Sequence, residues 1–251
     1  MDMGLKDKVA LVTGAGRGIG ADIAMQLAAE GCKVAVCDLD ATPAASVAEA
    51  IIKAGGKALA VTADVASRVS VRDAVAQIVK SLGPVEILVN NAGFSQDAPL
   101  EEMTDEQWDR VIDVCLKGSW LCSQAVVAGM KAMGRGRIIN IASRAHLGEN
   151  RKSNYCAAKA GVLGLTSALS LELGHSGITV NSVAPGLIRT DRVQNLQYYE
   201  DIDRRAKLST PIQRAGMPQD IASAVTYLAS EHAGFVSGQT LYVTGGRYSS
   251  T

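Results

Sequence analysis

TGAGRGIG, residues 13 to 20, is the stretch that decides the fold of this chain. Gly14, Gly18 and Gly20 permit a tight turn, close approach of backbone N–H groups to a pyrophosphate, and close packing of a helix on a strand. An anion bound there would meet the positive end of the following helix. A glycine-rich turn is also common as a purely structural connection, so the stretch by itself leaves both interpretations open.

The rest of the chain alternates short β-branched runs with longer segments of helical period. Runs such as VALV and RIINIA are apolar on both faces, which is typical of a parallel sheet covered by helices on either side. The sequence therefore predicts an α/β fold with a doubly wound parallel sheet, a Rossmann fold, as a single domain over residues 1–251. The predicted strands are 9–13, 33–38, 58–62, 87–90, 137–143, 179–184 and 240–243. The predicted helices are 19–30, 43–54, 69–82, 105–133, 155–173 and 219–230.

Charge, apolar patterning and cysteine content argue against several classes of protein. Lys plus Arg and Asp plus Glu both number 25, and no long run of one sign could follow a phosphate backbone, so we expect no nucleic-acid partner. The stretch VALV is too short for a signal peptide, and no other apolar run approaches membrane length. The five cysteines show neither CxxC spacing nor a metal-binding cluster with the histidines. We expect reduced thiols, no metal, no membrane and a cytoplasmic location.

An acidic residue follows the glycine-rich stretch at an informative distance. The second predicted strand ends CDLD, which places Asp38 eighteen residues after Gly20. A carboxylate there can accept hydrogen bonds from the adenosine ribose hydroxyls, and its charge would repel a 2′-phosphate. Arg17 favours the opposite preference, because a guanidinium could bind that phosphate. We give the carboxylate more weight, so NAD is predicted over NADP, with a simple turn aspartate as the alternative.

Further motifs follow in a recognisable order. NNAG occupies residues 90–93, Ser143 ends the fifth predicted strand, YCAAK covers 155–159, and PGLIRT covers 185–190. The chain then closes with GQTLYVTGG. Together with TGAGRGIG, these motifs match the short-chain dehydrogenases/reductases in order and approximate spacing, so essentially the whole chain resembles that family.

The resemblance implies cofactor contacts at the carboxyl ends of successive strands, which is the edge where ligands bind in such sheets. Asp64 would contact the adenine, the NNAG residues would line the cofactor, and residues 185–190 would hold the nicotinamide end. Structural alternatives are a turn before a helix, a backbone turn and a strand terminator, respectively. The residues implied are Gly14, Arg17, Gly18, Ile19, Gly20, Asp38, Leu39, Asp64, Val65, Asn90, Asn91, Ala92, Gly93, Tyr155, Lys159, Pro185, Gly186, Ile188 and Thr190.

Tyr155 and Lys159 lie four residues apart in SNYCAAKAG, on one face of a predicted helix. Hydride transfer between a carbinol carbon and nicotinamide needs a group that exchanges the hydroxyl proton, and a free phenol has a pKa of about 10. The Lys159 ammonium favours the phenolate, so Tyr155 could serve as general base or acid. Ser143 could orient the substrate oxygen. We therefore predict Ser143, Tyr155 and Lys159 as catalytic, with an ordinary surface pair as the alternative. The resemblance also implies that Lys159 bonds the nicotinamide ribose.

One position departs from the family pattern. The family usually has an asparagine in a stretch resembling VNLKG, whereas this chain reads VCLKG with Cys115. The resemblance implies that this asparagine holds a water on the proton path from the lysine to solvent. A thiol would hold that water poorly. We expect Cys115 to slow proton relay without abolishing hydride transfer; the alternative is that it only packs a helix.

The segment RAHLGENRKSN, residues 144–154, is expected to line the substrate pocket. Its four basic residues could bind a carboxylate, sulfonate or CoA phosphate, although exposed loop cations are common. They are Arg144, His146, Arg151 and Lys152. The polar stretch 187–211 has little periodicity and is predicted to form a lid, where Arg189 and Arg192 could add to the same charge.

The leading prediction is an NAD-dependent oxidoreductase that interconverts a secondary alcohol and its ketone, with an anionic or hydroxyacyl-type substrate as one option. An NADPH-dependent 3-oxoacyl reductase is the alternative within that class. A weakly active cofactor-binding subunit of a hetero-oligomer is the alternative from another class. The resemblance also implies a homotetramer, with helices 105–133 and 155–173 and the closing GQTLYVTGG at subunit contacts.

Overall fold

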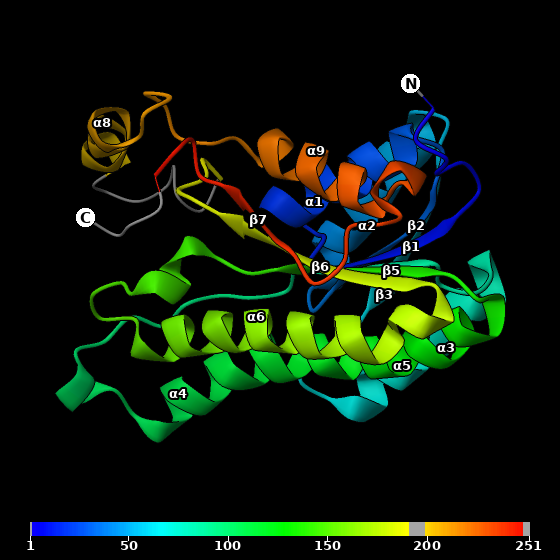
Figure 1. Ribbon diagram of the computed structural model, residues 1–251, viewed down its shortest axis with the longest axis horizontal. Helices are drawn as coiled ribbons and strands as arrows, with labels where there is room; N and C mark the ends of the chain where they lie inside the picture. The colour runs from blue at the N-terminus through cyan, green and yellow to red at the C-terminus, as the bar shows by residue number, and fades with distance from the viewer. Residues whose placement is uncertain (1, 191–198, 248–251) are drawn as a thin grey trace.

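The computed structural model describes residues 2–190 and 199–247, which form a seven-stranded parallel sheet between two helical layers (Figure 1). The strand order is β3-β2-β1-β4-β5-β6-β7. This arrangement confirms the predicted doubly wound α/β fold in a single domain. The strands are β1 (Val9–Thr13), β2 (Lys33–Asp38), β3 (Lys57–Thr62), β4 (Ile87–Asn90), β5 (Gly136–Ile141), β6 (Ile178–Pro185) and β7 (Thr240–Val243).

Helices cover both faces of the sheet because successive strand residues point to opposite sides. In β1, Ala10 and Val12 pack in the core beneath α1, α2 and α9, whereas Val9 and Leu11 pack in the core beneath α3, α5 and α6. Figure 1 shows the first group above the sheet and the second below it. The helices are α1 (Gly18–Ala29), α2 (Ala41–Lys53), α3 (Arg68–Leu82), α4 (Asp105–Ile112), α5 (Gly118–Met133), α6 (Ser153–Leu173), α8 (Tyr199–Ser209) and α9 (Pro218–Ala229).

The strand order reverses between β1 and β4, which places a crevice at the carboxyl ends of these strands. From β1 the chain moves outward to β2 and β3, and then returns to the other side of β1 through β4. The glycine-rich stretch 13–20 and the NNAG stretch 90–93 follow these two central strands. The topology therefore brings both motifs to one edge of the sheet.

The long helix predicted over residues 105–133 is interrupted in the structure. A π-helical turn, Asp113–Lys117, separates α4 from α5 and contains the buried Cys115. The interruption was not predicted from the sequence, because the helical periodicity continues on both sides of it. Single π turns within helices occur frequently at functional sites, so this one directs attention to Cys115.

Two further predictions near the site differ from the structure. β5 ends at Ile141, and Ser143 instead caps the short 3-10 helix η3 (Arg144–Leu147) by accepting a hydrogen bond from the Ala145 N–H at 3.1 Å. A serine hydroxyl competes well for such caps, which explains why the strand stops early. The predicted lid 187–211 contains helix α8, which lies beyond the carboxyl edge, at the left of Figure 1. Residues 191–198 of that lid, including Arg192, lie outside the described residues.

Two helical segments, Asp105–Met133 and Ser153–Ser176, are long and apolar enough to cross a membrane by length and composition alone. This differs from the expectation that no apolar run approaches membrane length. In the structure α5 and α6 contact strands β5 and β6 and contribute to the core on that face of the sheet. Core helices of globular domains meet the same two criteria, so the finding is weak evidence for a membrane span.

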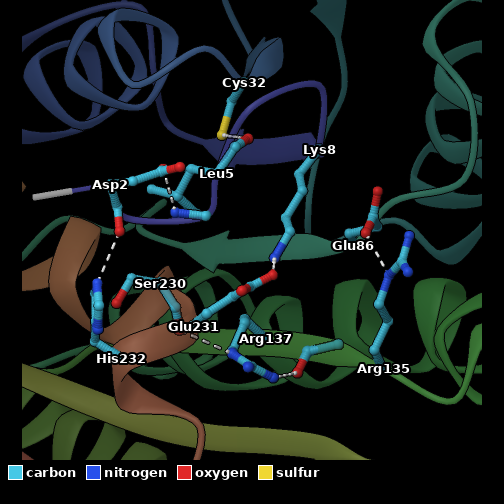
Figure 2. A network of polar contacts seen from close by, with 12 residues as sticks. Asp2, Leu5, Lys8, Cys32, Glu86, Arg135, Arg137, Ser230, Glu231 and His232 are labelled. Atoms are coloured by element: carbon cyan, nitrogen blue, oxygen red, sulfur yellow. Dashed lines mark hydrogen bonds and ion pairs between the residues drawn. The ribbon is translucent and has the colours of Figure 1, made fainter.

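A polar network ties the start of the chain to the amino edge of the sheet (Figure 2). Lys8 Nζ lies 3.1 Å from Glu231 Oε1, and Arg135 Nε lies 2.7 Å from Glu86 Oε2. The Arg137 guanidinium donates to the carbonyl of the residue before Glu231 at 3.4 Å. Charged side chains at this edge therefore pair with groups of the protein itself.

Candidate active site

A cavity of about 1850 Å³ opens at the carboxyl edge of the sheet. This is larger than the roughly 300–1,000 Å³ of a pocket for one small ligand, so it has room for an extended dinucleotide and a second molecule. Most of the predicted site residues meet there. Those that line it are Gly14, Arg17, Gly18, Ile19, Gly20, Asp38, Leu39, Asp64, Val65, Asn91, Ala92, Gly93, Ser143, Tyr155, Lys159, Pro185, Gly186, Ile188 and Thr190.

The loop between β1 and α1 requires glycine for conformation and for space. Gly14 and Gly18 have φ angles of +61° and +55°, in the left-handed region that residues with a Cβ rarely adopt. A Cβ at Gly20 would lie 2.2 Å from the Gly14 carbonyl oxygen, far inside van der Waals contact. The close packing of α1 on this loop is therefore possible only without side chains at these positions.

The first turn of α1 is suited to an anion. Arg17 is the N-cap residue, but its side chain makes no capping hydrogen bond, and the first turn contains no acidic residue. The N–H groups at a helix start carry partial positive charge and need acceptors from outside the helix. The residues present thus fit the pyrophosphate of a dinucleotide, which would supply those acceptors.

Asp38 lies at the end of β2 and faces the glycine loop. Its Oδ2 accepts a hydrogen bond from the Gly16 N–H at 2.8 Å, and its Oδ1 accepts one from the Asp40 N–H at 3.1 Å. The Arg17 guanidinium forms an ion pair with Asp40. The Arg17 guanidinium, which could bind a 2′-phosphate, is thus already paired with the Asp40 carboxylate. Gly16 was missed at the sequence level, where it is the remaining glycine of TGAGRGIG.

Thr13 and Asn91 join the glycine loop to the NNAG turn. Thr13 Oγ1 accepts hydrogen bonds from the N–H groups of Asn91 at 3.0 Å and Ala92 at 3.1 Å. Asn91 Nδ2 in turn donates to the carbonyls of Thr13 at 2.9 Å and Gly14 at 3.0 Å. Thr13 was missed at the sequence level, where its only signal is a hydroxyl residue ending a buried strand. These contacts hold two segments of the cavity wall in a fixed relation.

Asn90 is not among the described residues that line the cavity, and its contact with the cofactor stays a prediction. Its buried side chain donates from Nδ2 to Asn140 Oδ1 at 2.8 Å, Ser123 Oγ at 3.2 Å and the Ser119 carbonyl at 3.2 Å. Neighbouring residues at a strand end face opposite sides, so Asn90 and Asn91 cannot both point into the cavity. Asn90 instead links β4 to β5 and α5.

Asp64 and Val65 follow β3 at the same edge. Asp64 Oδ1 accepts a hydrogen bond from the Ala66 N–H at 2.9 Å, which is the turn role given above as its alternative. Both Asp64 and Val65 also line the cavity. The turn therefore positions Asp64 at the wall, and a contact with the adenine stays a prediction.

Lys159 is a buried cation beside Tyr155, and both residues line the cavity. Its Nζ donates to the Ile141 carbonyl at 2.6 Å and lies 5.6 Å from the centre of the Tyr155 ring. Burial lowers the pKa of Lys159 because the charged form loses hydration, and only the nearby Cys115 acts in the opposite direction. The predicted arrangement of both side chains on one face of α6 is what the structure shows.

Asn154 anchors the start of α6, a role that was not predicted from the sequence. Its Nδ2 donates to the carbonyls of Gln96 at 3.1 Å and Gln107 at 3.2 Å, and its Oδ1 accepts from the Tyr155 N–H at 2.7 Å. The side chain is fully buried. The available signal was an asparagine at a helix start, a position where this residue type is favoured. Asn154 thereby sets the position of Tyr155.

Ser143 lines the cavity just beyond the end of β5. His146 Nδ1 lies 2.7 Å from the Ser143 carbonyl oxygen, and His146 Nε2 lies 2.9 Å from the Tyr242 hydroxyl. Because a carbonyl only accepts, Nδ1 donates, and in the neutral ring Nε2 accepts from Tyr242. His146 is not among the described residues that line the cavity, and its contact with an anionic substrate stays a prediction. In the structure it holds the segment that carries Ser143.

Cys115 lies close to Lys159. Its Sγ donates to the Phe94 carbonyl at 3.4 Å. A Cβ added to Gly93 would lie 3.2 Å from Cys115 Sγ and 3.4 Å from Lys159 Nζ, so the thiol and the ammonium border the same small space. This position suits an effect on proton relay, and full burial suits a packing role. Both interpretations stay predictions.

The basic residues expected at the substrate side divide into two groups. Arg144 and Lys152 line the cavity, whereas Arg151 is exposed and does not. Lys152 Nζ lies 2.5 Å from Glu149 Oε1, so its charge is largely offset. Arg247 also lines the cavity, and its place near the C-terminus kept it out of the sequence analysis.

The stretch after β6 passes over the glycine loop. Residues 185–188 and Thr190 line the cavity, whereas Arg189 does not. A Cβ at Gly18 would lie 3.4 Å from Thr190 Cγ2, which places Thr190 directly against the loop. The stretch after β6 thus forms a wall of the cavity beside the start of α1.

The chain is similar to known proteins over nearly its whole length. A family model described as "Enoyl-(Acyl carrier protein) reductase" matches residues 14–247. The chain is 42% identical to the (2S)-[(R)-hydroxy(phenyl)methyl]succinyl-CoA dehydrogenase subunit BbsD of Thauera aromatica, over 98% of each chain. It is 43% identical to the 3-oxoacyl-[acyl-carrier-protein] reductase FabG of Staphylococcus epidermidis, over 96% of this chain and 99% of that one.

Solved structures agree with these matches. A candidate gluconate dehydrogenase from Agrobacterium tumefaciens has a TM-score of 0.95 at 32% identity, with 100% of both chains covered. A candidate short-chain alcohol dehydrogenase from Sinorhizobium meliloti has a TM-score of 0.93 at 34% identity, covering 99% of this chain and 98% of that one. The chain therefore belongs to the short-chain dehydrogenase/reductase family of oxidoreductases.

Proposed function

We propose that this protein is an NAD-dependent oxidoreductase that interconverts a secondary alcohol and its ketone, with Tyr155 as general acid/base. The observation that carries the proposal is that Ser143, Tyr155 and the buried Lys159 line the same cavity as the glycine loop. A hydroxyl, an ionisable phenol and a cation in one cavity provide what proton exchange at a carbinol oxygen requires.

The residues of the chain would orient the substrate and move its proton. When bound, the nicotinamide group supplies or accepts the hydride. The Ser143 hydroxyl would donate a hydrogen bond to the substrate oxygen, and Tyr155 would remove the hydroxyl proton in oxidation and return it in reduction. Lys159, held by the Ile141 carbonyl at 2.6 Å, would favour the phenolate through its charge and bond the nicotinamide ribose.

The charges near the end of β2 support NAD as the cofactor. Asp38 lines the cavity beside the glycine loop, and Arg17 is already paired with Asp40. A 2′-phosphate in this region would meet two carboxylates and one guanidinium that is already engaged. Like-charge repulsion then disfavours NADP, whereas the ribose hydroxyls of NAD could donate to Asp38.

Cofactor choice is tested by Asp38→Asn, which keeps an oxygen acceptor for the Gly16 N–H and removes the charge. The ratio of kcat/KM for NAD to that for NADP should fall by about tenfold, because relief of one repulsion is worth about 1.4 kcal/mol. Exposed Asp73→Asn on α3 is the matched control and should leave the ratio unchanged. A wild-type preference for NADP would contradict the proposal.

The reaction is tested by following NADH absorbance with a panel of secondary alcohols and hydroxyacyl thioesters and both cofactors. Wild-type protein should turn over at least one compound class, whereas Tyr155→Phe should bind NADH and remain inactive. Wild-type protein that binds NADH and oxidises nothing in the panel would count against a dehydrogenase.

The relatives favour hydroxyacyl compounds within that panel. One is named as the dehydrogenase of a hydroxylated succinyl-CoA derivative, and another as a reductase of 3-oxoacyl groups on a carrier protein. Both names describe conversion between a hydroxyl and a carbonyl group on an acyl thioester. The second candidate function is therefore an NADPH-dependent 3-oxoacyl reductase, which the cofactor titration distinguishes.

A subunit of low activity is the candidate from another class. The Thauera relative is named as a subunit, and Cys115 departs from the pattern at the proton path. The intact set of Ser143, Tyr155 and Lys159 argues for activity of the chain alone. If the purified chain bound NADH but turned over substrate only after addition of a second protein, this alternative would be favoured.

We also propose that the protein is a cytoplasmic homotetramer. β7 is an edge strand. Leu241 on β7 and Leu171 on α6 are 40% and 85% exposed in the isolated chain, and apolar side chains at subunit contacts would be exposed in this way. All five cysteines are free, which suits a reducing compartment. Sedimentation equilibrium should give four times the chain mass of 26.2 kDa, and a monomeric mass would contradict the assembly.

A further inference from the structure

Ser143 lines the cavity at a point where strand β5 has already ended. The Ala142 N–H still donates to the Val183 carbonyl at 2.8 Å, but Ser143 already caps the short turn η3. Its Oγ accepts a hydrogen bond from the Ala145 N–H at 3.1 Å. A hydroxyl has one donor and two acceptor sites, so this bond leaves the donor available to a substrate oxygen. The position of that donor therefore depends on how firmly the turn is held.

Backbone hydrogen bonds alone hold η3 weakly. The His146 N–H donates to the Ser143 carbonyl at 3.2 Å, and the Gly148 N–H donates to the Ala145 carbonyl at 2.9 Å. A 3-10 turn has poorer hydrogen-bond geometry than an α-helix. Gly148, with a φ of +109°, ends the turn after four residues, and Leu147 is exposed. Support for the turn must therefore come from side chains.

His146 supplies that support through both nitrogens of its ring. Nδ1 lies 2.7 Å from the Ser143 carbonyl oxygen, closer than the backbone N–H that donates to the same oxygen. Nε2 lies 2.9 Å from the hydroxyl of Tyr242. Contacts at both nitrogens of a rigid ring fix its orientation and its tautomer. The ring thus connects Ser143 to a tyrosine in a distant part of the sequence.

Tyr242 is itself anchored beside the segments that form the site. It belongs to the edge strand β7, which pairs with β6. Its side chain packs against a buried cluster formed by Ala142, Val162 and Ala184. The first of these directly precedes Ser143, and the second lies on α6, the helix that carries the predicted acid/base. Tyr242 therefore holds His146 from a cluster to which both parts of the site contribute.

We propose that His146 is a positioning residue, which holds the Ser143 hydroxyl against the substrate oxygen, and that Tyr242 holds His146 in turn. This inference rests on the proposed function, because that function places Ser143 at the carbinol oxygen. His146 is not among the described residues that line the cavity, so it acts through Ser143 and not on the substrate. A donor to a reacting oxygen must lie within a narrow range of positions, so loss of its support slows the chemical step.

Two variants separate the two contacts of the His146 ring. In His146→Asn, Nδ2 is as many bonds from the backbone as Nδ1 of the ring, so it can still donate to the Ser143 carbonyl. In His146→Gln, Oε1 is as many bonds from the backbone as Nε2 of the ring, so it can accept from Tyr242. The glutamine has no group left for the Ser143 carbonyl. The pair therefore tests the contact with Ser143 at nearly constant size and polarity.

Hydride transfer is measured in single turnovers with NADH and acetoacetyl-CoA, or with the fastest compound of the panel if acetoacetyl-CoA is not reduced. His146→Gln should slow this step by about tenfold, whereas His146→Asn should stay within about threefold of the wild type. KM for NADH should change in neither variant. With deuterated NADH, the isotope effect on kcat should increase in His146→Gln, because the chemical step then limits turnover. A purely structural role of His146 would not produce this increase.

Tyr242→Phe tests the second contact. It should slow hydride transfer by about threefold in the wild type and cause no further loss in His146→Gln, where the link to Ser143 is already broken. His175→Asn and His175→Gln are the matched controls and should keep the wild-type rate, since His175 is exposed and is not among the described lining residues. Thermal unfolding verifies that each variant is folded, and His146→Leu replaces the glutamine variant if that variant is not.

The possible outcomes are distinct. If His146→Gln were as fast as the wild type, or if the asparagine and glutamine variants were slowed equally, the inference would be overturned while the proposed function stood. Additive losses in the double variant would overturn the role of Tyr242. A wild-type protein that reduced or oxidised nothing in the panel would instead overturn the proposed function, and this inference with it.

Discussion

The two edges of one sheet use their polar side chains in different ways. At the amino edge, charged groups pair with each other, as Lys8 does with Glu231 at 3.1 Å and Arg135 with Glu86 at 2.7 Å (Figure 2). At the carboxyl edge, the buried Lys159 bonds a backbone carbonyl at 2.6 Å and, among the described residues, forms no ion pair. Ion pairs such as that of Arg17 with Asp40 also form at the carboxyl edge, but there Lys159 places a buried charge at the cavity wall, where a ligand can respond to it.

Polar contacts at the carboxyl edge mainly shape the backbone around the cavity. Asp38 accepts from the Gly16 N–H, and Asn91 donates to the Gly14 carbonyl. Such bonds fix the loops, while the cavity of about 1850 Å³ stays open between them. The comparison indicates that the amino edge contributes mainly to stability and the carboxyl edge mainly to function. Substitutions at the carboxyl edge should therefore lower activity with little loss of stability. Substitutions at the amino edge should lower stability with little loss of activity.

The largest effect is expected from Tyr155→Phe at the carboxyl edge. It should lower kcat by about 10²–10⁴-fold, because it removes the group that exchanges the substrate proton. Stability should change little, since only a hydroxyl at a cavity wall is lost. Steady-state kinetics and thermal unfolding measure both quantities. Tyr227→Phe on α9, outside the cavity, is the control, and a Tyr155→Phe enzyme as active as this control would break the comparison.

Lys159→Met should separate activity from stability most clearly. Loss of the charge that favours the Tyr155 phenolate should lower kcat by about a hundredfold, in line with a pKa effect of one to three units. The unfolding free energy at neutral pH should rise, because a buried cation is replaced by an apolar side chain of similar length. Exposed Lys53→Met controls for loss of a charge.

The stability gain of Lys159→Met should depend on pH. Burial lowers the pKa of Lys159, so the native protein releases this proton at a lower pH than the unfolded chain, in which lysine has a pKa of about 10.4. Below the native pKa the native state bears the full cost of the buried charge, and this cost disappears as pH rises to the unfolded value. Urea unfolding should show the difference from wild type shrinking between these limits. A difference that grew with pH would contradict this account.

A smaller effect is expected from Glu86→Gln at the amino edge. The side chain of Glu86 is 11% exposed and that of Arg135 is 61% exposed, so loss of the ion pair should lower the unfolding free energy by only about 1 kcal/mol. kcat should remain at the wild-type value. Urea unfolding and kinetics are compared with Glu101→Gln, an exposed position. Altered kcat in Glu86→Gln alone would show that the two edges are coupled.

The smallest effect is expected from Cys115→Asn, which places an amide beside Lys159. Turnover should rise by a few-fold in both directions, because an amide holds a relay water better than a thiol. The pH dependence of kcat is compared with that of Cys115→Ala, which removes the thiol without adding a hydrogen-bonding group. If turnover of Cys115→Asn matched the wild type at every pH, packing would be the role of Cys115.

The fold and the helix that carries Tyr155 and Lys159 were accessible from the sequence because both depend on local periodicity. Strands β1, β2, β4 and β7 have the predicted bounds, and the four-residue spacing of Tyr155 and Lys159 places both at the cavity. Alternation along a buried strand and one turn of a helix are short-range regularities, so neighbouring residues suffice to reveal them. The predicted strand ends then placed the expected site at the carboxyl edge of the sheet.

The tertiary structure decided which polar groups face the cavity and which are used up inside the protein. Asn90 turned toward Asn140, and His146 turned toward Tyr242, although sequence position placed both near the site. Arg247 reached the wall beside Arg144 from the far end of the chain. Such outcomes depend on long-range packing between segments that are distant in sequence, where the nearest available acceptor or donor sets the direction of a side chain. The sequence by itself determined the frame and the placement of Tyr155 and Lys159 on one face of a helix, and long-range contacts determined which other side chains surround that pair in the cavity.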